Sequence, residues 1–158
     1  MTSERLCGIT LPAIMKHSLL ILCLAVVFSS KVIAGYSEQE IVAATLIMEA
    51  GGEHHKYGMI AVYEVIQNRA SVANKTFSQI CLARKQFSCW NGITDISKTI
   101  AKAKKHTKWN DAMRVVINDL NIKYTRGATH YHSNKINPPS WSKKMICIGS
   151  IGNHIFYR

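Results

Sequence analysis

Two apolar segments with helical spacing, joined by a short glycine-containing loop, constrain the fold of this chain most. The first segment, "EIVAATLIMEA" (40–50), places apolar side chains on one face of a helix. Ser37 and Glu40 have the spacing of a capping box, which marks the start of that helix. Gly51 and Gly52 are expected to end it, because glycine readily adopts the left-handed conformation. The second segment, "GMIAVYEVIQNRASVA" (58–73), predicts another helix directly afterwards.

The remaining segments predict short helices followed by a small β element. One or two helical turns are expected in "TFSQICLARKQFSCWNG" (76–92), and two helices in "TDISKTIAKAKKHTKW" (94–109) and "NDAMRVVINDL" (110–120). Further on, aromatic and β-branched residues flank the turn "GSIGN", which predicts a hairpin that pairs 145–148 with 154–157. The predicted fold class is α+β and mainly α-helical, in a lysozyme-like arrangement with a small C-terminal β-hairpin.

The first 34 residues have the pattern of a secretory signal peptide. Basic residues precede the apolar run "LLILCLAVVF" (19–28), and small residues lead to a predicted cleavage site after Ala34. The run is too short to span a bilayer comfortably, and a retained anchor is the alternative. The chain of 158 residues is therefore divided into a signal peptide at 1–34 and one domain at 35–158. A secreted or periplasmic location follows.

The charge of the exported domain favours a polyanionic partner. The chain has 20 lysines and arginines and 9 acidic residues; three of the basic and one of the acidic residues lie in 1–34, which leaves a net charge of +9. An acidic envelope polymer or a membrane surface fits this charge, and export argues against nucleic acid. The lysines between 98 and 108 are interpreted as a solvated helix face, and a positive charge that only maintains solubility is the alternative.

Three cysteines remain after the predicted cleavage. Cys81 and Cys89 are predicted to form a disulfide that closes a short loop, as an oxidising compartment permits. Cys147 lies within the apolar stretch "MICIG" and is expected to be buried. The cysteines lack the C-x-x-C spacing of a zinc or redox site.

Glu49 is the candidate general acid. It ends an apolar helix beside Ile47 and Met48, and an apolar setting favours the protonated form of a carboxyl group. A protonated carboxyl group is what a glycosidase needs in order to protonate the leaving oxygen. The alternative is a solvated carboxylate at a helix end.

A zinc site is the competing possibility. Five of the six histidines after residue 34 are considered as imidazole ligands, and the "HYH" segment would place two of them on one face if it formed a strand. A catalytic zinc ion needs three protein ligands, but no H-E-x-x-H spacing is present, so no metal and no cofactor are predicted. The histidines concerned are His54, His55, His130, His132 and His154.

Four blocks of sequence resemble the SleB/CwlJ-type cell-wall hydrolases. "EAGGEHHKYGMIAVYEVIQNR" (49–69) is similar to the opening motif of that family, E-A-x-G-E followed by G-x-x-A-V-x-x-V-x-x-N-R. "KQFSCW" (85–90) matches its Gln-Phe-Ser segment, and "GATHYHSNKINPPSW" (127–141) and "IGNHIFYR" (151–158) resemble its late motifs. The blocks occur in the order of the family and extend over nearly the whole exported domain.

The resemblance implies a lysozyme- and lytic-transglycosylase-like fold, action on peptidoglycan and roles for individual residues. Glu49 matches the catalytic glutamate, and Glu53 matches the second glutamate, which binds substrate, orients water or supports the loop. Gly51 departs from the family, which often has arginine there. The implied substrate-binding residues are Glu53, Tyr131, His132, Asn153 and His154, and the implied structural residues are Gly52, Asn68 and Arg69.

The expected reaction is cleavage of the β-1,4 bond between N-acetylmuramic acid and N-acetylglucosamine by a monomeric enzyme with one decisive glutamate. Phe87 and Trp90 are either a rim of the glycan groove or part of the core. A zinc-dependent amidase that cuts the muramoyl–alanine bond is the alternative function. A wall-binding module without catalysis is a third.

Overall fold

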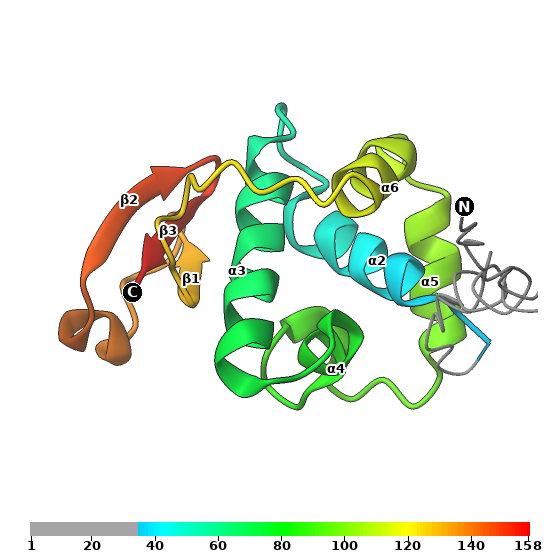
Figure 1. The fold of residues 1–158 in the computed structure, drawn as a ribbon, viewed down its shortest axis with the longest axis horizontal. Helices are drawn as coiled ribbons and strands as arrows, with labels where there is room; N and C mark the ends of the chain where they lie inside the picture. The colour runs from blue at the N-terminus through cyan, green and yellow to red at the C-terminus, as the bar shows by residue number, and fades with distance from the viewer. Residues whose placement is uncertain (1–34) are drawn as a thin grey trace, which may run out of the picture. The chain divides into compact units, whose positions relative to one another are not determined.

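The computed structural model describes residues 35–158, so the predicted signal peptide at 1–34 lies outside the described residues. The elements follow one another as helices first and strands last (Figure 1). They are α2 (Glu38–Ala50), α3 (Tyr57–Ala73), α4 (Phe77–Leu82), η1 (Ser88–Trp90), α5 (Ile96–Lys104), α6 (Trp109–Ile117), β1 (His130–Ser133), η2 (Ser140–Lys144), β2 (Cys147–Ile151) and β3 (His154–Tyr157).

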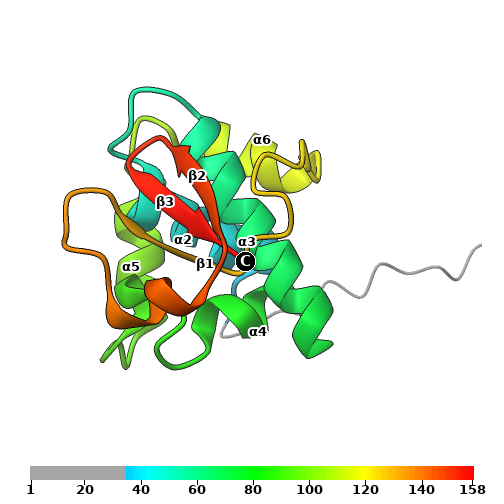
Figure 2. The ribbon, with the colours of Figure 1, turned by 90° about the vertical axis from the view of Figure 1, so that its left-hand side faces the viewer.

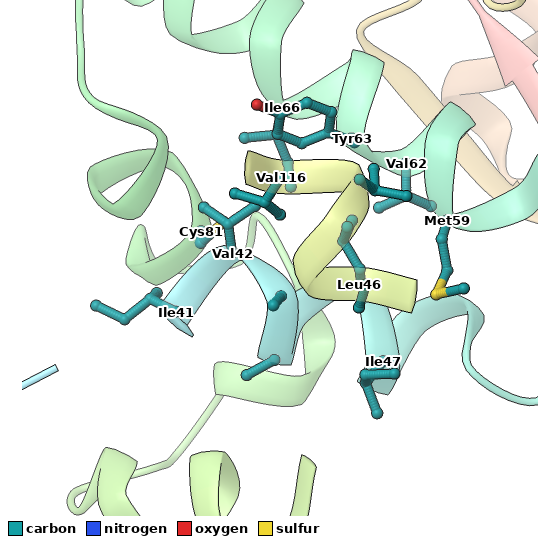
Figure 3. Close-up of a cluster of buried hydrophobic side chains, with 14 of the residues drawn as sticks. Ile41, Val42, Leu46, Ile47, Met59, Val62, Tyr63, Ile66, Cys81 and Val116 are labelled. Atoms are coloured by element: carbon teal, nitrogen blue, oxygen red, sulfur yellow. The ribbon is translucent and has the colours of Figure 1, made fainter. Parts of the chain in front are cut away.

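Helix α2 is the centre of the helical core. Six consecutive residues, from Ile41 to Leu46, are completely buried, and six residues cover more than one helical turn. The helix is therefore buried on every side, not on the single face predicted from its sequence, because α3, α4, α5 and α6 all contact it. Figure 3 shows side chains of α2 meeting Met59 of α3, Cys81 of α4 and Val116 of α6.

The predicted start of α2 is confirmed, whereas the predicted mechanism of its end is wrong. The Ser37 hydroxyl accepts from the Glu40 backbone N–H, and the Glu40 carboxylate accepts from the Ser37 backbone N–H, which completes the capping box. Gly51 ends the helix in the right-handed region, at φ −64°, and Gly52 is not among the glycines with positive φ. The chain leaves the helix through a turn in which the Glu53 backbone N–H donates to the Ala50 carbonyl.

A three-stranded antiparallel sheet follows the helices. The predicted hairpin is confirmed as β2 paired with β3, although β2 runs from Cys147 to Ile151 and not over 145–148, so that part of the predicted turn belongs to the strand. The third strand, β1, was considered only as a carrier of histidine ligands and not as part of the sheet; it pairs with the other edge of β3. The sheet packs on α3 through Ala61, Val65 and Phe156, and it lies in front of α3 in Figure 2. The α+β, mainly helical fold class is thereby confirmed.

A buried carboxylate in α3 anchors the long connection between α6 and β1. Glu64 accepts four hydrogen bonds from that connection: three from the backbone N–H groups of Ile122, Tyr124 and Thr125, at 2.8–3.1 Å, and one from the Thr125 hydroxyl, at 2.8 Å. A buried carboxylate is tolerated when its oxygens are satisfied in this way. Glu64 therefore fixes the path by which the chain reaches β1.

We expect Glu64→Gln to destabilise the domain by about 2–4 kcal/mol, because an amide nitrogen replaces one accepting oxygen and leaves buried donors without a partner. Urea denaturation measures the change. Asp111→Asn is the matched control, since the Asp111 side chain on α6 is partly exposed and pairs with the exposed Arg114, so its change should stay within about 0.5 kcal/mol. Equal stability of the two variants would show that Glu64 does not anchor the connection.

None of the helices found between residues 35 and 158 has both the length and the apolar character needed to cross a membrane.

Candidate active site

Glu49 lies where α2, η1 and β1 meet. Its side chain is half-buried, and the Tyr131 hydroxyl of β1 donates to its Oε2 at 2.9 Å. The Ser88 hydroxyl of η1 lies 3.5 Å from its Oε1, at the limit of a hydrogen bond. Burial and the neighbouring Glu49 carboxylate raise the pKa of the Cys89 thiol. The carboxyl group is thus held by neighbours from two other elements and still reaches solvent.

Tyr131 is fixed by aromatic packing on the face of the sheet that meets α3. Its ring makes an edge contact with His154 at 4.9 Å between centroids and a tilted contact with Phe156 at 5.5 Å. Burial, together with the nearby Glu49 charge, raises the pKa of Tyr131 well above its usual value. The hydroxyl therefore stays protonated and remains a donor to Glu49.

Asn68 and Arg69 hold the backbone that leads into β1. The Asn68 amide donates to the Ala128 carbonyl at 2.8 Å, and Arg69 Nε donates to the Thr129 carbonyl at 2.6 Å. Arg69 also donates from Nη1 to the Gln86 carbonyl at 3.2 Å, and its guanidinium lies over the Phe87 ring. These contacts agree with the structural role predicted for both residues.

Glu53 is enclosed by protein, with 6% of its surface exposed. Its Oε1 accepts from the Asn153 backbone N–H at 3.0 Å and faces His154 Nδ1 at 3.1 Å. A Cβ atom at Gly58 or Gly152 would collide with its carboxyl group. Of the roles predicted for Glu53, this geometry favours support of the loop over contact with substrate.

The other residues predicted from the sequence are dispersed. His132 is buried on the opposite face of β1 from Tyr131, where it stacks on Tyr157 and its Nε2 faces the Tyr157 hydroxyl at 3.0 Å. Asn153 lies in the turn between β2 and β3. Gly52 is exposed, and a Cβ there would meet nothing within 4 Å, so the structure gives no steric reason for glycine. The structure therefore does not bring His132 to Glu49.

The predicted disulfide is wrong, because Cys81 and Cys89 are both free thiols in the structure. Cys81 is completely buried in the core, and burial raises the pKa of its thiol to about 12. A thiol that is buried and protonated is a poor participant in disulfide exchange. Cys147 is also free, and it is exposed, contrary to the expected burial.

Phe87 and Trp90 belong to the core. Both are buried, and the Trp90 indole N–H donates to the Thr45 hydroxyl of α2 at 3.0 Å. Of the two positions weighed from the sequence, the rim of a glycan groove is therefore wrong for these side chains.

The histidines do not converge on a metal site. His54, His55 and His130 are exposed, whereas His132 and His154 are buried and engaged with Tyr157 and Glu53. Within residues 35–158, no group of three or more histidine, cysteine, aspartate or glutamate side chains has the arrangement of a metal site. The zinc-dependent alternative therefore lacks a donor set in the described part of the chain.

Two neighbours of Glu49 were missed from the sequence. Ser88 belongs to the "KQFSCW" block that carried part of the family resemblance, so the block itself was a signal for a site residue. Cys89 was considered only as a disulfide partner. Tyr131 was identified, but its bond to Glu49 depends on how β1 meets α2 and has no local signal.

Comparison with solved structures confirms the lysozyme- and lytic-transglycosylase-like architecture. The catalytic domain of the germination-specific lytic transglycosylase SleB from Bacillus anthracis is 24% identical, with a TM-score of 0.58 over 80% of this chain and 100% of that one. The catalytic domain of the Bacillus cereus SleB protein is 27% identical, with a TM-score of 0.51 over 80% of this chain and 95% of that one. No curated protein matches the chain significantly in sequence.

The family model described as Cell Wall Hydrolase matches residues 52–157. The match covers more than half of the chain and includes every strand of the sheet, together with α3 to α6. Glu49 lies three residues before its start. By this match, which agrees with the resemblance in the four sequence blocks, the chain belongs to the cell wall hydrolase family.

Proposed function

We propose that this protein cleaves the glycan strands of peptidoglycan at the β-1,4 bond between N-acetylmuramic acid and N-acetylglucosamine, with Glu49 as both acid and base. The observation that carries the proposal is the placement of the Glu49 carboxyl group, half-exposed and next to the Tyr131 and Ser88 hydroxyls. The Bacillus anthracis protein that shares this fold is a lytic transglycosylase, which supports the same class of reaction. Action on the wall implies an exported protein, in agreement with the predicted signal peptide.

The proposed reaction uses one carboxyl group twice. Protonated Glu49 gives its proton to the glycosidic oxygen, the bond from that oxygen to C1 of muramic acid breaks, and an oxocarbenium-like centre develops. The Glu49 carboxylate then takes the proton of the muramic C6 hydroxyl while that oxygen bonds to C1. The ring closes as a 1,6-anhydro sugar, no water is consumed, and Glu49 is protonated again.

A two-carboxylate mechanism is less well supported. Such a mechanism needs a second carboxylate or acid on the other side of the scissile bond. Glu53 is the nearest candidate in sequence, but its carboxyl group faces Asn153 and His154 inside the protein. The single-glutamate route therefore agrees best with the placement of the two carboxyl groups.

Tyr131 is proposed to hold the Glu49 carboxyl group in position and to stabilise it after proton transfer. We expect Tyr131→Phe to lower kcat/KM on purified peptidoglycan about 10- to 100-fold, because a hydrogen bond to a charged group contributes about 1.5–3 kcal/mol. Phenylalanine keeps the ring contacts with His154 and Phe156, so the urea midpoint should change little.

Tyr124→Phe is the matched control for that variant, since Tyr124 is exposed and its ring packs on Tyr57, away from Glu49. It should retain the activity of the wild-type protein. Full activity of Tyr131→Phe would remove Tyr131 from the proposed mechanism.

The chemistry of the products separates the proposed function from the zinc-dependent amidase. Purified peptidoglycan is digested with and without a metal chelator, and new sugar termini and new alanine amino groups are counted. We expect new muramic termini in equal amounts under both conditions and no new alanine amino groups. New amino groups that disappear with the chelator would identify the amidase, and no release at all would indicate a binding module.

A further inference from the structure

A groove next to the Glu49 site has the chemistry of a peptide-binding site. The groove lies between the C-terminal end of α3, α4 and the start of β1, with a volume of about 320 Å³. It contains basic and apolar side chains and no acidic one. The side chains that give the groove this character are Arg69, Val72, Ala73, Lys75, Ala83 and His130.

The positive charge of the groove has no acidic partner in contact. Arg69 binds two backbone carbonyls through Nε and Nη1, and no ion pair is formed by Arg69 or Lys75 within residues 35–158. Burial and the Arg69 charge lower the pKa of His130, so Arg69 and Lys75 supply the charge at neutral pH. Two cations facing an open groove favour an anionic ligand.

The apolar side chains of the groove set a second requirement for its ligand. Val72 has 82% of its surface exposed, although it is a large apolar residue on α3. Ala73 and Ala83 contribute further apolar surface. A ligand that fits this lining combines carboxylates with small apolar groups. A short peptide that contains alanine and free carboxylates has that composition, whereas a glycan strand without peptides has only the carboxylates of its lactyl groups and lacks the alanine side chains.

The groove adjoins the Glu49 site through Arg69 and β1. Arg69 donates to the Thr129 carbonyl, and Tyr131, two residues further along the chain, donates to Glu49. Burial lowers the pKa of Arg69, and the Glu49 carboxylate acts in the opposite direction, so the two side chains lie within electrostatic range of each other. A peptide attached to a sugar bound at Glu49 would therefore reach the groove within a few residues, since an extended chain spans about 3.5 Å per residue.

We propose that this groove binds the stem peptide of the muramic acid residue next to the cleaved bond, with Arg69 and Lys75 pairing with its carboxylates. The inference rests on the proposed function, because the peptide is attached to the sugar that Glu49 would cleave. Its consequence is a preference for glycan strands that carry peptides over strands from which the peptides have been removed.

The first test compares cleavage of peptide-bearing and peptide-free glycan strands by Lys75→Glu and by Lys98→Glu, a matched control on α5 outside the groove. We expect Lys75→Glu to lower the ratio of kcat/KM on the two substrates at least about tenfold, as the loss of one charge-assisted contact predicts. Lys98→Glu should leave the ratio unchanged. An unchanged ratio for Lys75→Glu, or an equal change for both variants, would overturn the inference.

The second test is independent of catalysis. Binding of a soluble stem pentapeptide to the wild-type protein and to Lys75→Glu is measured by calorimetry at low and high salt. We expect the wild-type protein to bind the peptide more weakly at high salt than at low salt. The affinity of Lys75→Glu should be at least about tenfold lower than that of the wild-type protein. If the wild-type protein cleaves neither substrate, the proposed function fails and this measurement alone decides the inference. Absence of peptide binding, or equal binding by both proteins, would overturn it.

Discussion

Glu49→Gln is expected to lower the rate of peptidoglycan cleavage at least about 1,000-fold, within the range that a general acid contributes. The amide has the shape of the carboxyl group but cannot deliver a proton to the glycosidic oxygen or accept one from the C6 hydroxyl. Its oxygen can still accept from the Tyr131 hydroxyl, so the local structure should persist. The rate of release of soluble muropeptides from purified walls measures the loss.

Two controls make this result specific to the acid. The urea midpoint of Glu49→Gln should match that of the wild-type protein, because the half-buried side chain keeps its size and its hydroxyl neighbours. Asp111→Asn, which changes a partly exposed carboxylate on α6, should retain full activity. A correctly folded Glu49→Gln with more than about a tenth of the wild-type rate would exclude Glu49 as the general acid.

The second large effect is on stability, because replacing Gly58 by alanine should have the opposite effect from the one usual in a helix. Alanine in place of glycine inside a helix normally stabilises a protein by about 1 kcal/mol. Gly58 lies in the first turn of α3, where an added Cβ would collide with the enclosed Glu53 carboxyl group. We therefore expect Gly58→Ala to destabilise the domain by about 2–4 kcal/mol, as displacement of a buried, hydrogen-bonded carboxylate predicts.

A double-mutant cycle isolates the cause of this reversal. In a Glu53→Ala background the Cβ has room, so adding Gly58→Ala should be neutral or stabilising by up to about 1 kcal/mol. Ser71→Ala, at an exposed position of the same helix, should be slightly stabilising in both backgrounds. The same effect of Gly58→Ala in both backgrounds would disprove the close approach of Glu53 to Gly58.

Local patterns were sufficient to predict the helices. The capping box at Ser37 and the apolar repeats of α2 and α3 are determined within one or two turns, and each predicted helix is present. The place of β1 in the sheet was missed because its partner, β3, lies more than 20 residues further along the chain. A strand whose partner is distant gives little signal in its own sequence.

The sequence was sufficient to identify two residues of the candidate site, but not to show how its side chains are arranged. Glu49 was identified by its apolar setting and its place in a family motif, and Tyr131 by a motif alone. The enclosure of Glu53 depends on Gly152 and His154, which belong to the hairpin formed by β2 and β3, so no local pattern reveals it. The disulfide prediction failed for the same reason, since spacing alone does not show that Cys81 points into the core.

Mass analysis of the muropeptides that the protein releases from purified peptidoglycan shows whether Glu49 cleaves the glycan by ring closure. We expect disaccharide peptides that end in 1,6-anhydromuramic acid, each lighter by one water than the product of hydrolysis, and none from Glu49→Gln. Reducing muramic acid termini would contradict the ring-closing mechanism. Intact glycan strands with their peptides removed would contradict cleavage of the glycan altogether.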